Sequence, residues 1–223
     1  MIGVKICGIT NVSDACSAVQ CGADAIGFIF YPKSLRYVRP EKVERIVKNL
    51  PSEVIRVGVF VNQEVQEVRE IVEFCALDLA QLHGDESAQY CSQFPISSLI
   101  KAVSPRAERE IQDLKNYPVR AILMDASEPG GYGGTGKISN WSLAIKIKET
   151  HPLVLAGGLN TDNVRAAIDA VRPEAVDINS GAEASPGKKD PDKMRRIIGI
   201  VRETEKQEEF KTEGGLHAKI FTR

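Results

Sequence analysis

The chain of 223 residues is 43% hydrophobic and 26% charged, and its 29 Lys and Arg residues almost balance 30 Asp and Glu residues. This is the composition of an ordinary globular protein, long enough for one core that buries about 70% of the surface of the unfolded chain. The chain lacks the clustered basic charge of nucleic-acid-binding proteins and the roughly 20 consecutive apolar residues of a membrane-spanning helix. We therefore expect neither nucleic acid nor a membrane as a partner.

Eight short runs rich in Val, Ile and Leu recur along the chain. They occupy residues 4–7, 25–30, 55–61, 77–82, 98–103, 119–125, 153–156 and 175–178. Segments with apolar residues at helical spacing lie between these runs, and Pro40 and Thr161 mark the expected starts of the second and seventh helices. Runs that are apolar on both faces indicate strands of a parallel sheet covered on both sides.

Eight such units within about 205 residues match the lower size range of the (β/α)8 barrel, also called the TIM barrel. A doubly wound open sheet is the main alternative, but its usual Gly-rich first turn is missing from residues 7–10. We therefore predict a single α/β barrel domain over residues 1–205. The polar residues 206–223 are expected to form a mobile extension with no assigned role.

Active sites of such barrels lie at the carboxyl ends of the strands, so polar residues at these ends are the candidates. Cys7, His83 and Asp125 end the first, fourth and sixth strands, Asp177 lies on the eighth, and Arg36 follows the second. A lone strand-end cysteine is more often a packing residue, and a strand-end aspartate can be a helix cap. A thiol and a carboxyl that face each other across a small mouth can act as base and acid.

Glycine-containing loops follow the seventh and eighth strands, with Gly157 and Gly158 in the first and Ser180 and Gly181 in the second. Loops at these two places commonly bind phosphate, because glycine lets backbone N–H groups approach an anion. The alternative is that both are only tight turns. We expect a phosphorylated small molecule as the substrate.

A third loop, residues 126–137, holds five glycines and follows the sixth strand. It is not a nucleotide-binding Walker loop, because Ile138 stands where a magnesium-binding hydroxyl would be. The length and the glycines favour a lid over the substrate.

The cysteines and histidines give no sign of a metal or a disulfide. Five cysteines without a Cys-x-x-Cys pair predict reduced thiols, and three widely spaced histidines, at positions 83, 151 and 217, predict no metal site. The amino-terminal sequence lacks the features of a secretory signal, which predicts a cytoplasmic protein.

Seven motifs in order resemble the phosphoribosylanthranilate isomerase family of tryptophan biosynthesis. They are KICGIT at 5–10, GFIF with SLRYV at 27–38, VGVFV at 57–61, QLHGDE at 81–86, GGTGK at 133–137, LAGGL at 155–159 and DINSGAE at 177–183. The resemblance runs from residue 3 to about residue 200. Asn179 and Ser180 depart from it, because the family often has two small residues there.

The resemblance implies a cofactor-independent isomerase, which converts N-(5'-phosphoribosyl)anthranilate to 1-(2-carboxyphenylamino)-1-deoxyribulose 5-phosphate by an Amadori rearrangement. It implies Cys7 as general base, Asp125 as general acid and Arg36 as the partner of the anthranilate carboxylate. His83 and Asp177 match motif positions and are given supporting or positioning roles at the substrate. Another phosphosugar enzyme, such as a ribulose-phosphate epimerase, and a catalytically silent phosphate-binding barrel are the alternatives. Monomer and homodimer both stay open.

The assigned chemistry makes two demands on proton affinity. An acid with the ordinary aspartate pKa near 3.9 is protonated in only about one molecule in a thousand at pH 7, so we expect burial to raise the pKa of Asp125. A thiol needs a positive neighbour to form the thiolate, and Lys5, two residues back on the same strand face, is the expected neighbour.

Overall fold

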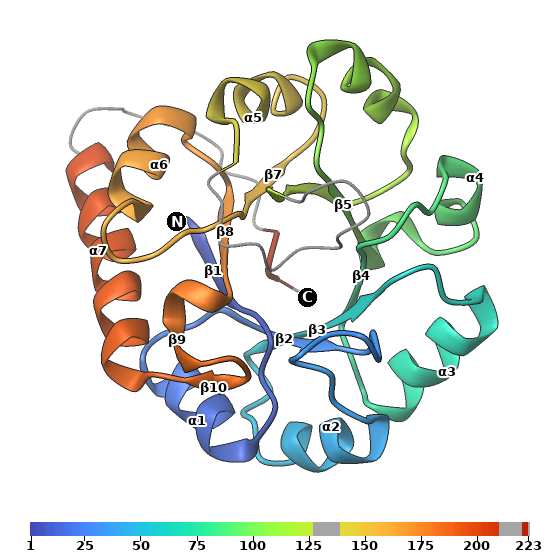
Figure 1. The fold of residues 1–223 in the computed structure, drawn as a ribbon, viewed down its shortest axis with the longest axis vertical. Helices are drawn as coiled ribbons and strands as arrows, with labels where there is room; N and C mark the ends of the chain where they lie inside the picture. Colours follow the sequence, from blue (N-terminus) through green and yellow to red (C-terminus); the bar gives the residue numbers. More distant parts are fainter. Residues whose placement is uncertain (127–138, 210–219, 223) are drawn as a thin grey trace.

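A computed structural model describes residues 1–126, 139–209 and 220–222, and Figure 1 shows a ring of strands surrounded by helices. Apart from Ala126, the predicted lid lies outside the described residues. None of the described helices is both long and apolar enough to cross a bilayer.

Eight parallel strands form a closed barrel in which each strand pairs with its neighbours in chain order and β1 pairs with β8. The strands are β1 Gly3–Ile6, β2 Ala25–Ile29, β3 Ile55–Phe60, β4 Leu79–Leu82, β5 Leu99–Val103, β6 Ala121–Met124, β7 Leu153–Leu155 and β8 Ala175–Ile178. Seven of the predicted apolar runs contain a whole strand, and β1 begins one residue before its run. The prediction of a TIM barrel is therefore confirmed, and the open sheet is excluded.

Helices cover the outside of the barrel (Figure 1). They are α1 Val12–Gln20, α2 Pro40–Val47, α3 Val65–Phe74, α4 Ala88–Cys91, α5 Trp141–Ile147, α6 Val164–Val171 and α7 Pro191–Glu209. Short 3-10 helices η1 Ile96–Ser98, η2 Glu108–Glu110, η3 Gln112–Asn116 and η4 Ser180–Ala182 lie in the connections, and a hairpin of β9 Glu183–Ser185 and β10 Lys188–Lys189 precedes α7.

The seventh helix of the barrel, α6, begins three residues later than predicted. Asn160 accepts a hydrogen bond from the backbone N–H of Asp162 at 2.8 Å, and Asn163 accepts one from Asn160 at 2.9 Å. These side-chain bonds satisfy the backbone in a non-helical turn over the residues where the helix was expected. The helix therefore starts only at Val164.

The described apolar side chains form three separate clusters. The largest cluster lies between strands and helices, whereas the second consists of strand residues of the barrel interior together with Ile220 and Phe221. A third, small cluster of Cys7, Ile29 and Val59 lies at the carboxyl ends of the first three strands. The apolar filling of the barrel therefore ends at the mouth where the site was predicted.

The predicted boundary at residue 205 differs from the structure at both described ends of the extension. Helix α7 continues to Glu209, because its apolar face still packs on the barrel at Val201 and Thr204 is buried. Ile220 and Phe221 are buried in the barrel interior. The prediction missed their burial because residues 206–223 are polar on average.

Candidate active site

One pocket at the carboxyl-terminal mouth of the barrel brings together eight of the nine predicted site residues. They are Cys7, Arg36, His83, Asp125, Gly157, Gly158, Asp177 and Ser180. Gly181 does not line the pocket, but it directly follows Ser180 in η4. The candidate base and acid thus lie at the same rim.

Cys7 follows β1 and lies against β2. Its backbone N–H donates to the carbonyl of Ile178 at 2.9 Å, which fixes the end of β1 against β8. Gly27 makes room for the side chain, since a Cβ at that residue would lie 2.7 Å from Cys7 Sγ and 3.1 Å from Lys5 Cε. The thiol and the lysine stem therefore lie on the same inward face, as the spacing predicted.

The pKa of Cys7 lies above its ordinary value. Burial of the thiol is the largest cause of this rise, the positive charge of Lys5 and its hydrogen bond oppose it, and the Asp177 carboxylate reinforces it. Lys5 Nζ donates to Asp177 Oδ1 at 2.9 Å inside the barrel, so part of its charge is neutralised. The expected influence of Lys5 is present in direction, but burial outweighs it.

Asp125 follows β6 and is hydrogen-bonded on both carboxylate oxygens. His83 Nε2 lies 3.3 Å from Asp125 Oδ2, and the backbone N–H of Ala126 donates to Oδ1 at 2.8 Å. Gln81 Nε2 lies 2.9 Å from His83 Nδ1. With the amide nitrogen as donor, Nδ1 accepts, and the imidazole proton lies on Nε2 facing the carboxylate.

This contact reverses the predicted shift of the acid. Burial raises the pKa of Asp125, as expected, but the hydrogen bond and electrostatic attraction of His83, and then the N–H of Ala126, lower it further than burial raises it. The net pKa therefore lies below its ordinary value, and the prediction of a raised pKa is wrong. Sequence gave no sign that an imidazole would lie against the carboxylate.

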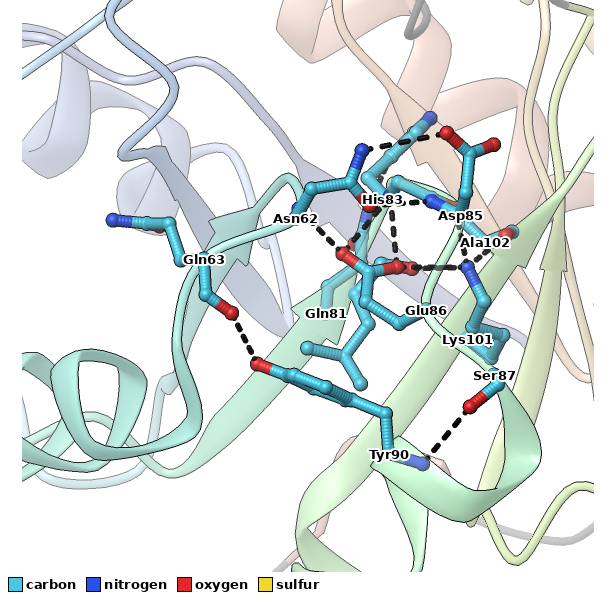
Figure 2. A network of polar contacts seen from close by, with 12 residues as sticks. Asn62, Gln63, Gln81, His83, Asp85, Glu86, Ser87, Tyr90, Lys101 and Ala102 are labelled. Carbon is cyan, nitrogen blue, oxygen red and sulfur yellow. Dashed lines mark hydrogen bonds and ion pairs between the residues drawn. The ribbon is translucent and has the colours of Figure 1, made fainter.

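A buried ion pair holds the loop that carries His83, as Figure 2 shows. Lys101 Nζ lies 3.0 Å from Glu86 Oε2 and donates to the carbonyl of Gly84 at 2.7 Å. Glu86 also accepts from the backbone N–H groups of Asn62 at 2.8 Å and Gly84 at 2.9 Å. A buried charge that is paired and fully hydrogen-bonded resists displacement, so this loop is a rigid support for the imidazole.

Arg36 is already paired. Its Nε and Nη2 donate to Glu183 Oε1 and Oε2 at 2.9 and 2.7 Å. Lys189 Nζ lies 3.1 Å from Glu183 Oε1 and donates to Asn179 Oδ1 at 3.0 Å. The side edge of the guanidinium is therefore occupied, but Nη1 has no partner in the described part of the chain, so the end edge is available for a second carboxylate.

The two predicted anion loops lie in direct contact. A Cβ on Gly181 would overlap the carbonyl oxygen of Leu159, so only glycine permits this approach. Gly157 and Gly158 have φ of 88° and 61°, in the left-handed region. No described residue accepts a hydrogen bond from the N–H groups of Gly157, Gly158, Ser180 or Gly181. Backbone donors without partners at a pocket are suited to an anion.

A comparison with protein families shows to which family the chain with this pocket belongs. A family model described as N-(5'phosphoribosyl)anthranilate (PRA) isomerase matches residues 4–199. The chain belongs to this isomerase family. The resemblance carried by the seven motifs is therefore confirmed.

A named sequence relative and two solved structures support the membership in this isomerase family. An N-(5'-phosphoribosyl)anthranilate isomerase of Syntrophus aciditrophicus is 55% identical over 202 residues, which cover 91% of this chain and 88% of the relative. The crystal structure of the Thermotoga maritima phosphoribosyl anthranilate isomerase has a TM-score of 0.84 at 47% identity, covering 91% of this chain and 100% of that one. Another structure of such an isomerase, in complex with reduced 1-(o-carboxyphenylamino)-1-deoxyribulose 5-phosphate, has a TM-score of 0.80 at 44% identity, with the same coverage.

The structure explains why this member of the isomerase family has an asparagine at position 179. Its side chain lies between Gly8 and the buried Lys189, since a Cβ on Gly8 would come within 2.6 Å of Asn179 Oδ1. The asparagine therefore accepts a hydrogen bond that a small residue could not. Its departure from the family pattern leaves the neighbouring Ser180 at the pocket.

Several residues that shape the isomerase pocket were missed from the sequence. Glu183 holds Arg36, Lys189 holds Glu183, and Gln81 orients His83. A separate finding is that no group of three or more metal-ligating side chains occurs in the described ranges. Glu183 ends a quoted motif and Gln81 begins another, so their positions were visible but their roles were not. Lys189 carried no signal, because it lies in the charged run KKD.

Proposed function

We propose that the chain catalyses the Amadori rearrangement of N-(5'-phosphoribosyl)anthranilate, with Asp125 as general acid and Cys7 as general base. The observation that carries this proposal is the single pocket that contains the thiol, the carboxylate and the anion loops. Relatives in the same family bear the name of this activity. The rearrangement then requires one proton donated and one removed on a single pentose.

The first step opens the sugar ring. Asp125 donates its proton to the furanose ring oxygen, the bond from C1' to that oxygen breaks, and the nitrogen lone pair forms the C=N bond of a protonated Schiff base. Water at the mouth returns Asp125 to the protonated form between turnovers. His83 keeps the carboxylate oriented through its Nε2 contact of 3.3 Å.

The second step moves the double bond. The Cys7 thiolate takes the proton from C2', the electron pair of that C–H bond forms C1'=C2', and the Schiff-base nitrogen becomes neutral. The resulting enolamine loses its hydroxyl proton and gains a proton at C1', which gives the ketone. No step requires a cofactor, because each transfers a proton only.

The two ends of the substrate would be held by opposite parts of the mouth. The end edge of Arg36 can meet the anthranilate carboxylate with two parallel hydrogen bonds. The amides of the loops after β7 and β8 would hold the phosphate. Asp177 supports the base side of the pocket through Lys5.

Replacing Arg36 by lysine should raise KM for the substrate by about 10-fold or more, with a smaller change in kcat. Lysine is a point charge and cannot hold Glu183 and a substrate carboxylate in two bidentate contacts. Steady-state kinetics measure the effect, and Arg39→Lys, on the exposed Arg39 nearby, is the matched control. An unchanged KM would remove Arg36 from carboxylate binding.

Replacing Lys5 by methionine should move the basic limb of the kcat/KM profile to higher pH. Asp125 titrates below and Cys7 above its ordinary value, so the active form, with Asp125 protonated and Cys7 ionised, has a constant share across neutral pH. The profile falls above the pKa of Cys7. Because Lys5 lowers that pKa, its removal raises it.

The pH profile of kcat/KM, with Lys42→Met on an exposed lysine as control, tests this prediction. A basic limb at the same pH in Lys5→Met and the wild type would show that Lys5 does not tune the thiol.

A direct assay tests the proposed function. Freshly made phosphoribosylanthranilate should be converted, with loss of its anthranilate-type fluorescence, and the rate should survive a chelator. Tight phosphate binding without turnover would favour the silent barrel, whereas epimerisation of ribulose phosphate would favour the other phosphosugar enzyme.

The proposal extends to the partners and the cellular location of the protein. The proposed partner is the phosphorylated small-molecule substrate, which the chain would bind as a monomer or as a homodimer. The cytoplasm, where a phosphorylated intermediate of amino-acid biosynthesis is expected, is the proposed location, and fractionation of cells tests it.

A further inference from the structure

The end of the barrel opposite the pocket is lined by unusually small residues. Four of the eight strands begin with glycine or alanine, at Gly3, Ala25, Ala121 and Ala175. The three alanines belong to the interior cluster. Barrel interiors are usually filled by bulky branched side chains, so small residues in one layer leave a hollow at the amino-terminal mouth.

Phe221 and Ile220 fill this hollow. A Cβ on Gly3 would lie 2.7 Å from Phe221 Cδ2 and 3.4 Å from Cε2, so the ring lies directly on the Gly3 backbone. Ile220 is 3% and Phe221 9% exposed, and both join the cluster of the barrel interior. Figure 1 shows this end of the chain inside the ring of strands.

A polar clamp fixes the segment next to the ring. Arg120, which directly precedes β6, donates from Nη2 to the carbonyl and the hydroxyl of Thr222 at 2.9 and 3.1 Å. Its Nη1 donates to the carbonyl of Ser97 at 3.1 Å, which ties the guanidinium to the start of β5. The clamp sets the register of the segment, because main-chain and side-chain oxygens of one residue are both held.

We propose that the amino-terminal hollow of the barrel is a specific docking site for residues 220–222 of the same chain. Phe221 and Ile220 supply the apolar anchor, and Thr222 supplies the polar contact. The family model ends at residue 199, so this segment lies beyond the part that matches the isomerase family. The site is at the mouth opposite Cys7 and Asp125, and it stabilises the barrel without taking part in the reaction.

The variant Phe221→Ala in the full chain tests the proposal. Loss of a buried aromatic ring should lower Tm by about 10 °C. Amide hydrogen exchange should rise by about 10-fold or more around Gly3 and Ala121, and not in α3. Turnover at 25 °C should stay unchanged. Phe74→Ala, at a phenylalanine that is 54% exposed on α3, is the matched control.

A peptide supplies a second, independent measurement. The peptide HAKIFTR, residues 217–223, should raise the Tm of the Phe221→Ala protein at millimolar concentration, and the same peptide with alanine for phenylalanine should not. If Phe221→Ala does not fold, Ile220→Val in the full chain should still lower Tm by about 2 °C.

Two results would overturn the proposal. One is a Tm and an exchange pattern in Phe221→Ala equal to those of Phe74→Ala. The other is a full-length dimer, seen by sedimentation, that dissociates in Phe221→Ala, because the hollow would then hold a second copy of the chain.

Discussion

Replacing Cys7 by serine should lower kcat by at least about 100-fold, the range expected for loss of a general base. Serine keeps nearly the same shape in the space that Gly27 leaves open, so the pocket should stay intact. Its hydroxyl holds its proton far more tightly than a thiol, so it cannot remove the proton from C2'. Steady-state kinetics on phosphoribosylanthranilate give the comparison.

The control separates chemistry from binding. Cys16→Ser, at a half-buried cysteine on α1 that does not line the pocket, should retain the wild-type kcat. Binding of inorganic phosphate as a competitive inhibitor should be nearly equal in Cys7→Ser and the wild type, because the amides after β7 and β8 are untouched. A normal kcat in Cys7→Ser would remove the thiol from the mechanism.

The pH dependence of the rate distinguishes loss of the base from a changed fold. In the wild type, burial places the pKa of Cys7 above its ordinary value of 9.0, so the basic limb of the rate profile belongs to this thiol. That limb should be missing from Cys7→Ser. A variant that lost activity only through a changed fold would keep it.

The barrel itself could be predicted because local pattern and global fold agree. Each strand is a short apolar run, and parallel strands of a barrel bring their carboxyl ends to one mouth. Cys7 and Asp125, 118 positions apart by their numbers, therefore had to lie at one rim once eight strands were counted. The rule that barrel strands end at one mouth predicts this proximity, although the sequence itself contains no distances.

The electrostatics of the site could not be predicted in the same way. The pKa of Asp125 depends on whether His83 lies within hydrogen-bond distance, and strand order alone does not fix a side-chain contact. Arg36 and its partner Glu183 lie 147 positions apart, so no local spacing connects them. The same holds for Phe221, whose place on Gly3 depends on a small layer of residues in four different strands.

Replacing Asp125 by asparagine should be as severe as the loss of the thiol, with kcat lower by at least about 100-fold. The amide keeps the size of the carboxyl and can still accept from His83 Nε2, but it cannot release a proton to the ring oxygen. Asp169→Asn, at an exposed aspartate on α6, is the matched control and should have full activity. Full activity in Asp125→Asn would require another acid.

Stability measured against pH tests the contact between Asp125 and His83 apart from catalysis. The folded protein holds the pKa of Asp125 below its ordinary value of 3.8, so the ionised carboxylate stabilises the fold above that pH. This contribution is lost as pH falls through the lowered pKa. At neutral pH the wild type should therefore have a higher Tm than Asp125→Asn, and the difference should shrink as the solution becomes more acidic than pH 3.8. A Tm difference that stays constant over this range would mean that the imidazole does not stabilise the ionised acid, and the rigid placement proposed for the proton donor would then lack its physical basis.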